Sequence, residues 1–119
     1  MAHKDELGRL GERLAAEHLG AAGFAILDRN WRCRLGELDI VARDGDETVF
    51  VEVKTRSGSG YGHPFDAIGA AKLTRLRRLA IAWCEALEHP AGRIRIDAVA
   101  VLVPSDGEVV IEHLRGVSR

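Results

Sequence analysis

The stretch GELDIVARDGDETVFVEVK, residues 36–54, constrains the fold more than any other part of the sequence. Apolar and polar residues alternate on both sides of the turn-forming residues DGDE, a pattern that predicts a β-hairpin. A loop of two residues (45 and 46) or four (44–47) would place Asp39 opposite Glu52, and Glu37 opposite Lys54, on one face. With an odd loop length the faces separate, and the two acids become ordinary exposed charges.

The rest of the chain predicts two helices and three further strands around this hairpin. The helices are expected at 4–20 and 67–88, the strands at 24–31, 94–103 and 109–114, and a glycine-rich loop at 57–64. The largely apolar run 94–103 is expected to lie centrally in the sheet. The order α-β-β-β-α-β-β predicts an α/β fold, in which a mixed sheet of about five strands is flanked by two helices. The 119 residues fit one domain, 1–119.

Glycines and tryptophans give two expectations about packing. Gly8 and Gly11 are poor helix formers, so the first helix is expected to pack closely against a neighbouring element there. Trp31 and Trp83 are expected to be core or partly buried packing groups.

Composition limits the classes of protein to which the chain can belong. An apolar share of 46% and a charged share of 29% are those of a soluble globular protein. No run of about 18 apolar residues is present, so no membrane span is expected, and the N-terminus lacks the pattern of a secretory signal. Cys33 and Cys84 form no CxxC pattern and are expected to be reduced, in the cytoplasm. The net charge of −1 neither supports nor excludes a nucleic-acid partner.

Two carboxylates opposite each other on a hairpin need an explanation, because like charges so placed destabilise a sheet. At an effective dielectric constant of 20, charges about 5 Å apart repel by roughly 3 kcal/mol. Either one carboxyl binds a proton through a raised pKa, or a cation lies between the two. Mg²⁺ or Mn²⁺ would suit oxygen ligands from Asp39 and Glu52. Lys54, on the same face, could orient or deprotonate a water molecule or stabilise a phosphate, so these groups indicate a phosphodiester hydrolase.

An aspartate on one strand, followed by Glu-x-Lys on the next, is the pattern of the PD-(D/E)xK nucleases, and here it reads Asp39 with Glu52 and Lys54. The sequence resembles the YraN-like family over nearly its whole length, most specifically in GELD and FVEVKTR. That family is similar in fold to archaeal Holliday-junction resolvases. The resemblance implies a restriction-endonuclease-like core and a metal-dependent nuclease acting on DNA, with branched or recombination-intermediate DNA as its substrate.

The resemblance also assigns roles to further residues. Glu12 occupies the position of a glutamate that joins the metal site in the resolvases, and the backbone carbonyl of Val53 completes the ligand set of the two strand acids. Glu37 belongs to the GExD motif of the YraN-like family and is a further candidate ligand. Lys72 matches a lysine that the family usually carries. The resolvases work as homodimers, so a homodimer is expected here.

Cationic side chains near the hairpin and on the second helix could hold a nucleic-acid backbone through contacts that carry little sequence information. The candidate contacts are Arg32, Arg34, Arg56, Lys72 and Arg75. A solvated helix face with ion pairs to nearby acids is the alternative interpretation of the helix cations.

Two functions of different classes remain open at this point: the nuclease, and a noncatalytic module of the same fold that binds nucleic acid or a protein partner. Simpler roles also remain for single residues. Glu37 and Lys54 could form a cross-strand ion pair, and Glu12 could be a solvated helix residue. His63 is expected to be a histidine on a loop surface. Asp97 is expected to be a structural residue at a strand start that could also help at the site.

Overall fold

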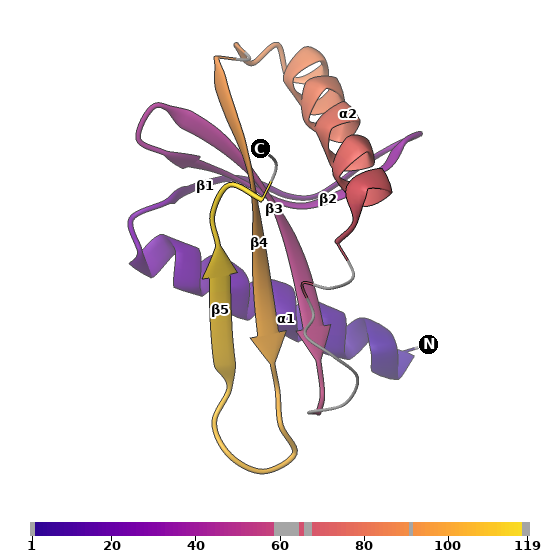
Figure 1. The fold of residues 1–119 in the computed structure, drawn as a ribbon, viewed down its shortest axis with the longest axis vertical. Coiled ribbons are helices and arrows are strands. Elements are labelled where there is room, and N and C mark those ends of the chain that lie inside the picture. Colours follow the sequence, from indigo (N-terminus) through magenta and orange to yellow (C-terminus); the bar gives the residue numbers. More distant parts are fainter. Residues whose placement is uncertain (1, 59–64, 66–67, 91, 118–119) are drawn as a thin grey trace.

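Two helices and five strands make up the computed structural model, which describes residues 2–58, 65, 68–90 and 92–117. In chain order they are α1 (Ala2–Ala21), β1 (Ala25–Cys33), β2 (Gly36–Asp44), β3 (Glu47–Arg56), α2 (Ala70–Ala86), β4 (Arg93–Leu102) and β5 (Val110–Leu114) (Figure 1). This order confirms the predicted α-β-β-β-α-β-β fold class, with element bounds within three residues of those expected. Across the described residues, neither helix is long and apolar enough to cross a membrane.

The strands form one mixed sheet in the order β1-β2-β3-β4-β5. Neighbours pair antiparallel except β3 and β4, which are parallel. A parallel pair needs a crossover connection, and α2 lies within the segment that provides it. Strand β4 lies between β3 and β5, which confirms the central position expected from its apolar sequence.

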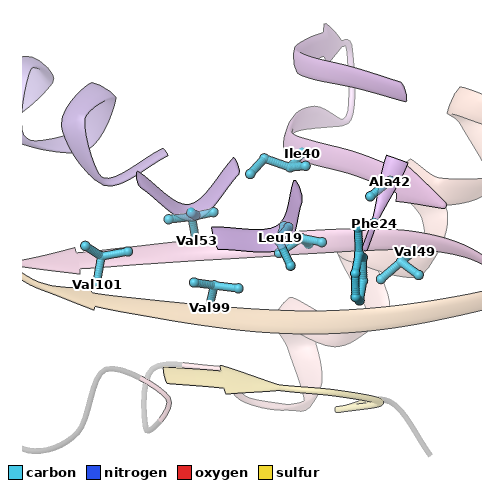
Figure 2. Packing of buried hydrophobic residues seen from close by; sticks show 10 residues of the cluster. Leu19, Phe24, Ile40, Ala42, Val49, Val53, Val99 and Val101 are labelled. Atoms are coloured by element: carbon cyan, nitrogen blue, oxygen red, sulfur yellow. The ribbon is translucent and has the colours of Figure 1, made fainter. Parts of the chain in front are cut away.

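The two helices cover opposite faces of the sheet, and α1 passes behind it in the view of Figure 1. On the α1 face, Ala15 and Leu19 pack against alternate residues of the strands, among them Val49, Val99 and Val101 (Figure 2). All five side chains are fully buried. The alternation of the strands sends their other residues to the opposite face.

The α2 face has its own buried core. Leu76, Leu79 and Trp83 of α2 pack against Val41 and Phe50 of the central hairpin. Trp31 is partly buried in the same cluster, so the packing role expected for both tryptophans is confirmed. The indole Nε1 of Trp83 donates a hydrogen bond to Asp28 Oδ2 at 2.9 Å, which satisfies the polar atom of a buried ring.

Helix α1 approaches β3 closely at one of the two glycines that the sequence singles out. A β-carbon on Gly11 would come within 2.8 Å of Thr55 Cβ, whereas one on Gly8 would have nothing within 4 Å. The expectation of close packing is therefore confirmed for Gly11 and wrong for Gly8.

We expect Gly11→Ala to lower the free energy of unfolding by about 1–3 kcal/mol, because the added methyl group overpacks the contact between α1 and β3. Gly8→Ala is the matched control and should be neutral or stabilising by up to about 1 kcal/mol, since alanine favours a helix. Urea unfolding of both variants tests this. Equal stabilities of the two variants would contradict the close approach at Gly11.

Candidate functional site

The hairpin β2–β3 has the register that its turn predicts. Asp44 pairs with Glu47 across a two-residue loop, and pairing continues to Ile40 with Val51. Gly45 has φ 64°, in the left-handed region that glycine tolerates best. The alternative with an odd loop and separated faces is therefore wrong, and Asp39 and Glu52 line one cleft.

Backbone pairing between β2 and β3 stops at Ile40, and beyond it the side chain of Asp39 makes the contact with β3. The N–H of Val53 donates to Asp39 Oδ2 at 2.8 Å. We call this end of the hairpin, where the ladder of backbone pairs has stopped, the β2–β3 fork. The open space beside it, which we call the acidic cleft, has a volume of about 830 Å³ and is lined by Gly8, Arg9, Glu12, Asn30, Arg32, Glu37, Asp39, Glu52, Val53 and Lys54.

The alternation expected for β2 breaks next to Asp39. Leu38 packs in the α2 core and Ile40 in the α1 core, although the period of two places them on one face. On the neighbouring strand, Asn30 lies between the partners of these two residues and has φ 53°. A residue in this left-handed conformation interrupts strand alternation, and asparagine is among the residues that tolerate it.

Asn30 is a site residue that the sequence reasoning missed. Its Nδ2 donates to Glu12 Oε1 at 2.7 Å and lies 3.5 Å from Glu37 Oε2. It thereby holds a helix acid and a strand acid at the edge of the same cleft. Its position in a strand, where asparagine is disfavoured, was the only signal available in the sequence.

Two lysine ammonium groups lie close to the carboxylate of Glu52. Lys72 Nζ, from the first turn of α2, lies 2.6 Å from Glu52 Oε2, and Lys54 Nζ lies 3.8 Å from the same oxygen. Glu52 itself is only 7% exposed, so its charge needs such partners. Lys72 was expected to contact nucleic acid, and the structure places it against an acid of the cleft.

The two lysines have pKa values shifted in opposite directions. Burial and the neighbouring Lys72 lower the pKa of Lys54. Burial also opposes the charge of Lys72, but the hydrogen bond and negative charge of Glu52 outweigh it and raise the pKa of Lys72. Lys72 therefore serves as the fixed positive charge, and Lys54 is the lysine that gives up its proton more easily.

Burial, followed by the negative charge of Glu52, raises the pKa of Asp39 to about 8, against the lowering effect of the Val53 N–H. Glu12 and Glu37 add smaller repulsions. Two explanations were predicted for neighbouring carboxylates, a bound proton and a bound cation. The raised pKa of Asp39 favours the proton in the metal-free protein.

This pKa predicts a stability that falls with rising pH in the metal-free protein. Between about pH 4 and pH 8 the folded chain retains a proton on Asp39 that the unfolded chain releases, so the free energy of unfolding falls across this window. Asp39→Asn should remove that fall and stabilise the protein at pH 9 by on the order of 3 kcal/mol, the repulsion between charges about 5 Å apart. Urea unfolding with a chelator, from pH 5 to pH 9, measures both; a variant less stable than wild type at pH 9 would contradict the raised pKa.

The alternative role for Glu37 and Lys54, a cross-strand ion pair between them, is wrong. Glu37 Oε2 lies 3.6 Å from Arg32 Nε, and Lys54 lies near Glu52 instead. The reason is that backbone pairing stops at Ile40, so nothing holds positions 37 and 54 opposite each other.

The donor set suits a hard divalent ion in part. In the described part of the chain, no three side chains of the types His, Cys, Asp and Glu form a group that could hold a metal ion. Mg²⁺ is commonly held by one or two carboxylates together with waters and substrate phosphates, so the pair Asp39 and Glu52 fits it. Glu12 lines the same cleft, and its role as a ligand stays a prediction.

The cations predicted to hold a nucleic-acid backbone divide into two groups. Arg32 lines the acidic cleft, and Lys72 and Arg75 line an adjoining pocket, the α2 pocket, which shares Glu37, Asp39 and Glu52 with the cleft. The remaining two, Arg34 and Arg56, are exposed and line neither. His63 lies outside the described residues.

Asp97 lies apart from the cleft in a buried network. It is fully buried and accepts hydrogen bonds from Arg95 Nε at 2.9 Å and from the Gly116 N–H at 2.9 Å. His113 Nε2 lies 2.8 Å from its other oxygen. The structural role expected for Asp97 is the one observed, but the residue lies in the middle of β4 and not at a strand start.

The fold and the site together define a small α/β protein whose central hairpin carries an acidic cleft with two lysines around one of its acids. Residues 11–101 match the family described as "Uncharacterised protein family UPF0102". The chain belongs to this family, which confirms the YraN-like resemblance predicted from GELD and FVEVKTR.

Named relatives match almost end to end. A UPF0102 protein of Arthrobacter sp. (strain FB24) is 57% identical over 117 residues, which are 98% of this chain and 99% of that protein. One from Streptomyces griseus is 56% identical over 121 residues, covering 99% and 100%. Among solved structures, the Holliday junction resolvase Hjc of Archaeoglobus fulgidus aligns with a TM-score of 0.45 and 19% identity, over 87% of this chain and 74% of that one.

Proposed function

We propose that this protein is a metal-dependent nuclease that hydrolyses phosphodiester bonds of DNA. The observation that carries the proposal is the convergence of Asp39, Glu52 and Lys54 on one open cleft, with Lys72 ion-paired to Glu52. Two acids that repel each other do not stabilise the fold, but they can bind a divalent ion, and the neighbouring lysines can bind a phosphate. Such a combination is typical of a functional site.

Asp39 and Glu52 would hold Mg²⁺ or Mn²⁺, with the Val53 carbonyl, Glu12 and Glu37 as candidate further ligands. The ion would supply Lewis-acid polarisation of a phosphoryl oxygen. Lys54, with its lowered pKa, can exchange a proton with the attacking water or stabilise charge on the phosphate. Lys72 pairs with the carboxylate of Glu52 and fixes its orientation through their 2.6 Å contact.

The cations of the cleft and of the α2 pocket would bind the flanking DNA backbone through Arg32, Arg75 and the exposed part of Lys72. Contacts of this kind read phosphates, so binding should be weakened by salt and depend little on sequence. The motif resemblance extends the proposal to branched or recombination-intermediate DNA and to a homodimer.

One observation favours the second candidate, a noncatalytic module that binds nucleic acid or a protein. The Lys72 ammonium group already satisfies Glu52, so this acid is stable without an ion. In such a module Asp39 would remain protonated near neutral pH and the cleft would bind DNA or a partner without cleaving it.

Two measurements separate these functions. Calorimetric titration of the chelator-treated protein with Mg²⁺ and Mn²⁺ should show binding to wild type. Incubation with linear, flap and four-way-junction DNA should then show cleavage that requires the metal. DNA binding with neither metal binding nor cleavage would establish the module instead.

A further inference from the structure

We propose that nucleic acid bound at the acidic cleft continues onto a second phosphate-binding surface on the other side of the fork, formed by Arg9, Arg13 and Arg29 of α1 and β1. This inference rests on the proposed function, because it extends the path of the same ligand. The class of ligand is a nucleic-acid backbone, recognised through its phosphates.

The first argument is that the hollows of the surface are continuous. A pocket between α1 and β1, the α1 pocket, is lined by Arg13, Arg29 and Glu6, and shares Arg9, Glu12 and Asn30 with the acidic cleft. At its other end the cleft shares its strand acids with the α2 pocket. The α1 pocket, the acidic cleft and the α2 pocket therefore adjoin in this order, and Asp39 and Glu52 lie in the cleft between the other two.

The second argument is the distribution of charge along this series. Lys72 and Arg75 lie at the α2 end, and the three arginines lie at the α1 end. A phosphodiester positioned at the acids would have its neighbouring phosphates on both sides, one toward each group of cations. The acidic cleft has four acids against three cations, whereas the α1 pocket has three arginines against two glutamates. A net positive charge next to the acids fits a polyanion whose reacting phosphate lies at the acids and whose neighbouring phosphates lie against cations.

The third argument is that Arg13 and Arg29 can be released for phosphate. Arg13 pairs with Glu17 at 3.6 Å across one helix turn, with side chains 59% and 62% exposed. Exposed pairs of this kind contribute little to stability, so exchanging the glutamate for a phosphate costs little. Arg29 is exposed, and its backbone N–H, not its guanidinium, donates to Asp28.

Helices α1 and α2 cover opposite faces of the sheet (Figure 1), so Arg9 and Arg13 belong to a helix on one face, and Lys72 and Arg75 to the helix on the other. Residues on both sides of the fork would therefore contribute to the affinity for one ligand. Removing either group should weaken the same binding event.

The test is fluorescence anisotropy with a labelled single strand and a labelled duplex, in chelator, at several salt concentrations. The double variant Arg13→Ala/Arg29→Ala should bind about tenfold or more weakly than wild type. Its slope of log affinity against log salt should be shallower by about 1.4–1.8, from roughly 0.7 to 0.9 per lost phosphate contact. The control Arg43→Ala/Arg93→Ala removes the same charge near the hairpin turn, away from these hollows, and should retain the wild-type slope.

A double variant with the wild-type slope, while Lys72→Ala/Arg75→Ala loses slope, would overturn the second surface and leave the proposed function standing. Absence of salt-dependent binding by the wild-type protein would overturn the proposed function together with this inference. Thermal unfolding of each variant confirms that its fold is kept.

Discussion

Asp39→Asn is expected to reduce metal-dependent cleavage of DNA by on the order of 10³-fold or more. Asparagine has the size of aspartate, and its amide oxygen can still accept the Val53 N–H that holds residue 39 in place. What it loses is the ability to carry a negative charge, so it cannot bind a divalent ion strongly. The variant should therefore be inactive and, above neutral pH, more stable than the wild type.

This combination separates a functional residue from a structural one, because a structural residue loses stability when it is replaced. Calorimetry with Mn²⁺ should show binding to wild type and none to Asp39→Asn. Asp46→Asn removes the same charge from an exposed turn residue whose ion pair is with Arg93, so it should keep wild-type metal binding and cleavage. Cleavage by Asp39→Asn at the wild-type rate would show that the activity arises elsewhere.

The hairpin that carries this site could be predicted because its determinants are local. The residues of the turn set the loop length, the loop length sets the register, and the register places Asp39 and Glu52 on one cleft. Asp39 and Glu52 lie one position beyond the last backbone pair, where the hydrogen bond from the Val53 N–H to Asp39 still holds the strands together. The same reasoning failed for Glu37 and Lys54, which lie three positions beyond that pair. A register predicts neighbours only along the ladder and directly next to it.

The position of Lys72 could not be derived from periodicity. A helical pattern predicts which face of α2 is buried, but how its first turn lies against β3 depends on the crossover and on the packing of Leu76 and Leu79. The 2.6 Å contact with Glu52 is a consequence of that packing. Asn30 is similar, because its left-handed backbone is stable only where the neighbouring strand and Glu12 support it.

Asp97→Asn is expected to have the largest effect on stability, a loss of about 3–5 kcal/mol in the free energy of unfolding. Asp97 is fully buried, and Arg95 is 16% exposed beside it. An asparagine cannot replace a carboxylate that accepts from Arg95, His113 and Gly116 at once, because its amide group offers one oxygen and places N–H donors against other donors. Arg95 would keep Asp44 and Glu47 as partners, so the loss arises from the buried donors around residue 97.

The direction of the pKa shift supports this expectation. Burial favours the neutral acid, yet the hydrogen bonds of His113, Arg95 and the Gly116 N–H outweigh it and lower the pKa of Asp97. The stability contributed by the carboxylate is therefore present above its unfolded pKa of about 3.9 and is lost as the pH falls through the lower folded value.

Thermal unfolding at pH 7 should show the Asp97→Asn melting temperature lower by roughly 10–20 °C. Asp44→Asn is the matched control, because Asp44 also contacts Arg95, at 3.0 Å, but its side chain is 31% exposed. That variant should lose less than about 1 kcal/mol, since partly exposed ion pairs contribute little. Metal binding by the folded Asp97→Asn protein should equal that of wild type, because its network lies outside the acidic cleft. Equal stabilities of Asp97→Asn and wild type would mean that this buried charge does not support the fold.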